Sequence, residues 1–266
     1  MKPRLTIITP SYNQAAFLER TLRSVLDQGY EDLEYLVIDG GSTDGSVEII
    51  ESYADRLAWW VSEPDSGQTA ALNKGLRRAT GEIVAYINSD DYYLPGAFQA
   101  AVQALAESDA RWAAGAARFV DEHDNVTEVW RAELPATPRH RWVLDPVGWP
   151  QAASFWQRDL FEEFGPFRED MHYVFDTEFG LRLALAGVLP AIIDRELAVR
   201  VVHPEAKSWD RTPFDREELR LLALYRSSLS PLERWRLALP AIAKRLAFWR
   251  LHAALRRTKP NAAAEG

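Results

Sequence analysis

The 266-residue sequence contains no cysteine, which excludes a disulfide framework, a thiolate metal site and a cysteine nucleophile. It also lacks any run of about 18 uninterrupted apolar residues, so we expect no membrane-spanning helix. The N-terminus passes from Met1-Lys2-Pro3-Arg4 directly into a short apolar strand, without the apolar core and cleavage site of a signal peptide. These absences favour a protein of the cytoplasm.

Negative charge dominates the chain, but it is unevenly distributed. The formal net charge is -8, and residues 231–260 carry eight Lys or Arg against one Glu, so this segment is +7 and the remainder is -15. An acidic body is a poor partner for nucleic acid, which requires a basic face. The basic segment interleaves Trp and Leu with Arg at helical spacing. This pattern is compatible with peripheral binding to an anionic membrane at the inner face of the plasma membrane, with a helix packed on the domain, or with a dimer surface.

The first ninety residues alternate between strand and helix patterns. Such alternation is typical of βαβ units, so the sequence predicts an α/β fold with a mostly parallel, Rossmann-like sheet and helices on both faces. The expected strands are 5–9, 34–38, 57–61 and 83–87, and the expected helices are 14–28, a helix through Tyr53 capped by Ser42-Thr43-Asp44, and 69–79.

The pattern changes after residue 95. We expect a helix at 96–107, a hairpin or meander from strands 111–120 and 126–131, a proline-rich loop at 133–150, regular structure at 152–156, helices at 158–164 and 176–186, a strand near 198–202 and two closing helices. The predicted organisation is a catalytic domain, 1–210, followed by a C-terminal helical extension, 211–266. Within the domain, 1–95 would bind a nucleotide and 96–210 an acceptor.

Polar clusters follow all four predicted strands of the first half, at 9–13, 39–46, 63–68 and 88–91. Any one cluster is equally well explained by the turn-forming tendency of Asp, Ser and Gly. Open parallel sheets bind ligands at the carboxyl ends of their strands, however, and the joint placement of four clusters there predicts a ligand site.

Asp90 and Asp91 form the most informative cluster. Two carboxylates directly after a buried strand repel each other and lose hydration, so they favour a compensating cation. Oxygen ligands of this kind suit Mg²⁺ or Mn²⁺, which often bridge to diphosphates. The alternative is that both residues cap the helix that begins near Pro95.

Four motifs in this order resemble the family 2 glycosyltransferases of the GT-A fold, and the resemblance covers residues 4–205. The motifs are Thr9-Pro10-Ser11-Tyr12-Asn13, Val37-Ile38-Asp39-Gly40-Gly41-Ser42-Thr43-Asp44-Gly45, Ser62-Glu63-Pro64-Asp65-Ser66-Gly67-Gln68 with Ala71-Leu72-Asn73-Lys74-Gly75, and Asn88-Ser89-Asp90-Asp91. The resemblance implies a nucleotide-diphosphate sugar as donor, held by Thr9, Pro10, Tyr12, Asp39, Asp65, Lys74 and Asp90. It also implies a DXD-type pair in which Asp90 faces the ribose and Asp91 binds the metal.

The segment Tyr173 to Leu183 resembles the family's acidic motif before an amphipathic helix, which makes Asp176 the candidate catalytic base. Sugar transfer with inversion requires such a base for the acceptor hydroxyl. Two alternatives remain: Asp176 caps the helix only, or Glu178 is the base. Phe175 stands where the family often has an acid, and this departure also leaves room for a binding protein without activity.

Three further residues are candidates by the same resemblance. Trp149 and Gln151 match the acceptor side, and the alternative is a core aromatic beside a solvated amide. His203 lies where related enzymes carry a histidine near the diphosphate, which makes it a candidate metal ligand, and the alternative is a structural histidine. Lys207 is a candidate phosphate contact, and Ala70 replaces an acid that close relatives commonly carry.

The sequence therefore predicts an inverting, Mg²⁺- or Mn²⁺-dependent glycosyltransferase, with a UDP-sugar as the favoured donor. The acceptor would be a saccharide or a lipid-linked saccharide, in cell-surface polysaccharide or glycoconjugate synthesis. A nucleotidyltransferase is the rival enzyme, but it would usually carry a glycine-rich, basic phosphate loop after the first strand. Residues 9–13 have neither feature.

Overall fold

The computed structural model describes residues 2–134, 149–207, 209 and 211–225. Residues up to Leu219 form one compact unit. Most of the predicted loop at 133–150, and the basic segment at 231–260, lie outside the described residues.

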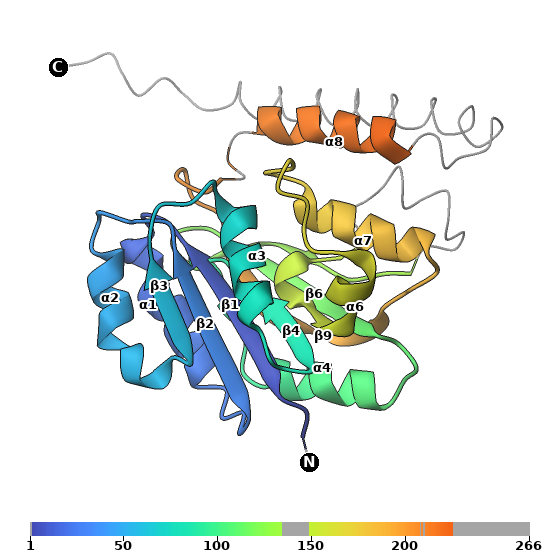
Figure 1. Cartoon of the computed structure of the whole chain (residues 1–266), viewed down its shortest axis with the longest axis horizontal. Coiled ribbons are helices and arrows are strands. Elements are labelled where there is room, and N and C mark those ends of the chain that lie inside the picture. The colour runs from blue at the N-terminus through green and yellow to red at the C-terminus, as the bar shows by residue number, and fades with distance from the viewer. Residues whose placement is uncertain (1, 135–148, 208, 210, 226–266) are drawn as a thin grey trace. The chain divides into compact units, whose positions relative to one another are not determined.

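The described part of the chain contains strands and helices in the order that the sequence predicts (Figure 1). The strands are β1 (Leu5–Ser11), β2 (Leu33–Asp39), β3 (Trp59–Ser62), β4 (Ile83–Tyr86), β5 (Tyr92–Tyr93), β6 (Trp112–Val120), β7 (Val126–Trp130), β8 (Ser154–Gln157) and β9 (Ala191–Val201). The α-helices are α1 (Ala15–Leu26), α2 (Ser46–Ser52), α3 (Gln68–Arg78), α4 (Ala97–Ala106), α6 (Asp159–Phe164), α7 (Phe175–Leu185) and α8 (Arg211–Tyr225). Two short 3-10 helices are η1 (Ala54–Arg56) and η2 (Gln151–Ala153).

These strands form a single mixed sheet. Its order is β3-β2-β1-β4-β8-β6-β9-β5, and β7 pairs with β6 outside this path. The first four strands are mutually parallel, whereas β8 runs antiparallel to both β4 and β6. The predicted α/β fold is confirmed. Because β4 and β8 are hydrogen-bonded, the two predicted halves share one sheet.

Alternating side chains of β1 serve the two faces of this sheet. Leu5 and Ile7 belong to the core on the face covered by α1, α2 and α4. Ile8 points to the opposite face, where α3 crosses the sheet (Figure 1). A Cβ at Gly75 of α3 would lie 2.7 Å from Cγ2 of Ile8, so only glycine permits this close approach.

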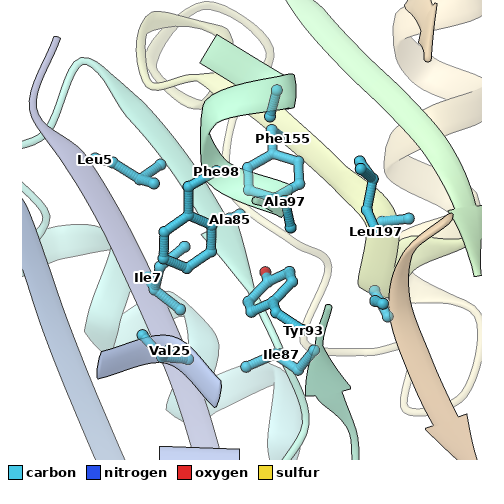
Figure 2. Close-up of a cluster of buried hydrophobic side chains, with 14 of the residues drawn as sticks. Leu5, Ile7, Val25, Ala85, Ile87, Tyr93, Ala97, Phe98, Phe155 and Leu197 are labelled. Atoms are coloured by element: carbon cyan, nitrogen blue, oxygen red, sulfur yellow. The ribbon is translucent and has the colours of Figure 1, made fainter. Parts of the chain in front are cut away.

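The main core joins the two predicted halves of the domain. Figure 2 shows Phe98 of α4 beside Tyr93 and Phe155, among aliphatic side chains of β1 and β4. The ring centroid of Phe98 lies 5.0 Å from that of Tyr93 and 6.1 Å from that of Phe155. Both contacts are edge-to-face, the preferred geometry of aromatic pairs.

A second aromatic cluster holds α6 and α7 against the other face. The rings of Phe161 in α6 and Phe179 in α7 stack with centroids 4.6 Å apart. Phe175, the first residue of α7, packs against Phe167 and Tyr86 and is buried. This cluster places the first turn of α7 near the carboxyl end of β4.

The structure corrects several details of the prediction. Gly45 precedes α2, so the cap predicted at Ser42-Thr43-Asp44 is wrong, although Asp44 accepts a hydrogen bond from the backbone N–H of Ser46. Helix α7 starts after Val174, so Asp176 is its second residue and does not cap it. Strand β9 begins at Ala191, earlier than predicted, because its first residues pair with β6, with Ala191 opposite Ala113. The short strand β5 was not predicted.

Candidate active site

The loops after β1 and β2 are joined by side-chain hydrogen bonds. Asn13 adopts a left-handed backbone conformation (φ 50°), and its N–H donates to Oγ of Ser42. Its side-chain oxygen accepts from the N–H of Thr43. These bonds hold the first two polar clusters as one unit at the carboxyl edge of the sheet.

Three residues of different clusters meet above this edge. Tyr12 is 63 % exposed, and its ring lies beside the bare backbone of Gly40. A Cβ at Gly40 would be 3.2 Å from Cδ2 of Tyr12 and 3.3 Å from Oδ2 of Asp65. An exposed aromatic ring and a carboxylate therefore converge where a base and a ribose could be stacked and hydrogen-bonded.

Other residues predicted to bind the donor are buried or have partners within the protein. Asp39 is fully buried, and its carboxylate accepts hydrogen bonds from the N–H groups of Gly41 and Ser42 and from the hydroxyls of Ser42 and Ser62. Thr9 shares a hydrogen bond with the hydroxyl of Tyr35. Pro10 is also buried, and Lys74 forms a 2.6 Å ion pair with Glu63.

The loop with the paired carboxylates is anchored by α1. The hydroxyl of Thr21 donates to the backbone carbonyls of Ser89 and Asp91, at 2.9 and 2.6 Å. The N–H of Asp91 donates back to the carbonyl of Asn88, which closes a tight turn. This turn gives the two aspartates different environments.

Asp91 points into the protein. Its Oδ1 accepts from the N–H of Val201, and its Oδ2 accepts from Asn88 and lies 3.7 Å from Nε of Arg200. Burial, and then the neighbouring Asp90 carboxylate, raise the pKa of Asp91 to about 7. These inward contacts argue against the predicted role of Asp91 as the metal ligand.

Asp90 instead meets His203. Oδ2 of Asp90 lies 3.2 Å from Nε2 of His203, and the hydrogen bond between them raises the pKa of the imidazole. The His203 ring is packed against Phe17 of α1, with centroids 4.3 Å apart. A carboxylate and an imidazole are thus held side by side next to the exposed polar clusters.

Asp176 lies near the same cations as the aspartate pair. Burial raises the pKa of Asp176, while the N–H of Thr177 and the charges of Arg200 and Lys207 act in the opposite direction. Arg200 also faces Asp91, so the charge of one guanidinium acts on both Asp176 and Asp91.

A chain of hydrogen bonds crosses the site. Lys207 donates to Oε1 of Gln68 at 2.8 Å, and Nε2 of Gln68 donates to Oδ1 of Asn88 at 2.6 Å. Nδ2 of Asn88 in turn donates to Asp91 at 3.3 Å. The chain connects three segments of the sequence, at 207, 68 and 88–91. Burial lowers the pKa of the Lys207 ammonium at its end.

Three other candidates are used elsewhere. Glu178 is buried and pairs with Arg182 at 2.5 Å, so this ion pair argues against it as the alternative base. Trp149 packs edge-on against Trp112 at 4.7 Å and lies over Gly180. Gln151 donates to the backbone carbonyl of Tyr86 at 2.8 Å. The contacts of Trp149 agree with its core-packing alternative, whereas the Gln151 amide is bonded to the backbone.

Sequence reasoning missed Arg200. A signal was present, because this residue is the one charged side chain in the otherwise apolar stretch Leu197 to Val202. A charged residue in the middle of a buried strand usually faces a charged partner, which here is Asp91.

Within the described ranges, no group of three or more His, Asp or Glu side chains is placed to hold a metal ion. No helix in the part of the chain that the structure describes is long and apolar enough to cross a membrane.

Comparisons with known proteins show the family of this chain. Residues 6–165 match the family model described as Glycosyl transferase family 2. An uncharacterized glycosyltransferase of Mycobacterium tuberculosis is 34 % identical over 188 residues, which are 69 % of this chain and 70 % of the relative. A putative teichuronic acid biosynthesis glycosyltransferase of Bacillus subtilis is 42 % identical over 93 residues, 34 % of this chain and 37 % of the relative.

The solved structure of TarS from S. aureus in complex with UDP-GlcNAc is similar in fold, with a TM-score of 0.69. The similarity covers 96 % of this chain and 76 % of that one at 18 % sequence identity.

Proposed function

Since the chain belongs to glycosyl transferase family 2 and has the GT-A fold, we propose that it transfers a sugar, with inversion, from a UDP-sugar to a saccharide or lipid-linked acceptor. Two observations support this proposal: the exposed Tyr12 ring and the Asp65 carboxylate meet at Gly40, and Asp90 faces His203 while the charge of Arg200 acts on both Asp91 and Asp176. The B. subtilis relative's name supports a role in cell-surface polysaccharide synthesis.

In the proposed reaction, Asp176 removes the proton of the acceptor hydroxyl. The acceptor oxygen forms a bond to the anomeric carbon as the bond from that carbon to the diphosphate breaks, and the nucleoside diphosphate leaves. The raised pKa of Asp176 makes it a stronger base than an exposed aspartate. The positive charges of Arg200 and Lys207 lie on the same side and favour the departing diphosphate.

Asp90 and His203 are the residues that would hold a divalent cation. Their facing atoms are 3.2 Å apart. A carboxylate oxygen suits Mg²⁺ or Mn²⁺, and a neutral imidazole nitrogen is a common metal ligand. The ion would neutralise the leaving diphosphate.

A thermal-shift panel tests the donor site. We expect one of UDP, GDP and dTDP to raise the melting temperature more with Mn²⁺ than without it, because a ligand of the folded state stabilises that state. Asp90→Asn should lose the Mn²⁺-dependent part of this shift, and Asp91→Asn should keep it. No shift with any diphosphate would contradict the donor site. Loss of the Mn²⁺-dependent shift in Asp91→Asn but not in Asp90→Asn would show that Asp91 is the metal ligand.

A second experiment tests catalysis. Asp176→Asn should retain the nucleotide-induced shift but lose at least a hundredfold in nucleotide release from the sugar donor, consistent with removal of a general base. Full activity of this variant would contradict the assignment of Asp176.

A further inference from the structure

The segment His172 to Val174 leads directly into α7, the helix that carries Asp176. Val174 is the N-cap of this helix, and its side chain makes no capping hydrogen bond. Helices usually begin at a residue whose side chain accepts a bond from the first turn, so the start of α7 has no local support of this kind.

Support comes instead from α8, more than forty residues later in the chain. Both carboxylate oxygens of Glu217 accept hydrogen bonds from three consecutive backbone N–H groups. Those of His172, Tyr173 and Val174 lie 2.8, 2.7 and 3.2 Å from the carboxylate. A carboxylate at this position also faces the positive end of the α7 dipole.

Two further contacts hold the same segment. The ring of Phe214, three residues before Glu217 and hence on the same side of α8, packs edge-on against Tyr173 with centroids 5.0 Å apart. The backbone carbonyl of His172 accepts a hydrogen bond from Lys207, whose ammonium also reaches Gln68 on α3. Glu217 therefore holds the three backbone N–H groups before α7, and Lys207 holds the carbonyl of His172.

We propose that Glu217 is a positioning residue for Asp176, and this inference rests on the proposed function. Phe175, the first residue of α7, turns its side chain into the aromatic cluster. Glu217 of α8 holds the backbone directly before Phe175 and so fixes the first turn, in which Asp176 is the second residue. The distance between the base and the donor site then depends on α8.

Amide hydrogen exchange tests the contact itself. Glu217→Gln keeps the size of the side chain but leaves one acceptor oxygen for three N–H groups. We expect the amides of residues 172–174 to exchange at least tenfold faster in this variant, with β1 and β2 unchanged. Glu122→Gln, at an exposed glutamate of the 121–125 turn, is the matched control and should change neither.

Kinetics test the positioning role. With the nucleotide sugar whose diphosphate gives the largest thermal shift, Glu217→Gln should lower kcat for nucleotide release at least tenfold and leave the donor KM within twofold. The donor-side residues are untouched, so the nucleotide-induced thermal shift should match that of the wild type and show that the variant is folded.

The two experiments fail in distinguishable ways. Unchanged exchange at 172–174, or faster exchange with unchanged kcat, would overturn the role of Glu217. Absence of nucleotide release from the wild type with UDP-, GDP- and dTDP-sugars would instead overturn the proposed function, and the exchange comparison would still decide whether Glu217 holds the segment.

Discussion

Neighbouring residues at this site differ in their contacts because their side chains point in different directions. Asp90 and Asp91 are neighbours, yet Asp90 faces His203 and Asp91 faces Arg200 and the backbone of Val201. The sequence predicted that both follow a buried strand. It did not predict which one faces outward, because the turn closed by Asn88 and Asp91 sets their directions.

Lys207 is expected to lower the pKa of Asp176, the proposed base. Its positive charge lowers the pKa of Asp176, which burial has raised. Because the base acts in its ionised form, activity falls as pH drops through that pKa. Lys207→Met removes the opposing charge, so the acidic limb of the kcat profile should move to higher pH. The pH profile of nucleotide release measures this, with Lys2→Met as the control. A limb that stays in place or moves to lower pH would contradict the coupling.

At the scale of elements, the polar clusters could be predicted and the long-range contacts could not. Parallel strands bring their carboxyl ends to one edge, so the alternation of strands and helices was enough to place Tyr12, Gly40 and Asp65 together. Glu217 gave no such signal, because an exposed helical glutamate and a helix-supporting one have the same local sequence. Only the packing of α8 distinguishes them.

Glu34 connects β2 to β1 and to the loop between α3 and β4. Its carboxylate accepts from the hydroxyls of Thr6 and Thr80 and from the N–H of Thr80, and it contacts Arg4. Burial alone would raise the pKa of Glu34, but these bonds lower it below its ordinary value. Glu34→Gln should cost about 2 kcal/mol of unfolding free energy.

The pH dependence of this contribution has a definite sign. Because the pKa of Glu34 is lower in the folded state than in the unfolded state, the stabilisation is present above the ordinary glutamate pKa of 4.5 and is lost as pH falls through the folded-state pKa. Urea unfolding measures this effect. The free energy of unfolding of Glu34→Gln should be well below that of the wild type at pH 7, and the difference should be smaller at pH 3. Glu31→Gln, at an exposed residue, is the control. Equal differences at both pH values would exclude this linkage.

At the scale of the whole molecule, the two predicted halves, 1–95 and 96–210, share one sheet and one core. Strand β8 of the second half pairs with β4 of the first, with Ile83 opposite Gln157 and Val84 opposite Trp156. The main core mixes residues of both halves, as Figure 2 shows for Leu5, Phe98 and Leu197. A shared sheet and core keep the base at a fixed distance from the donor site.

A substitution in the second half should therefore destabilise the first. Phe155 of β8 is fully buried and contacts Tyr93 and Phe98. Phe155→Ala should cost about 3–5 kcal/mol. If unfolding is a single cooperative transition, the slowest-exchanging amides of β1 and β2 should exchange at least about a hundredfold faster, since each 1.4 kcal/mol corresponds to roughly a factor of ten. Val126→Ala, at an exposed position, should leave them unchanged. Unchanged exchange in β1 and β2 of Phe155→Ala would show that the halves unfold separately, and a fixed geometry between base and donor site would then require another explanation.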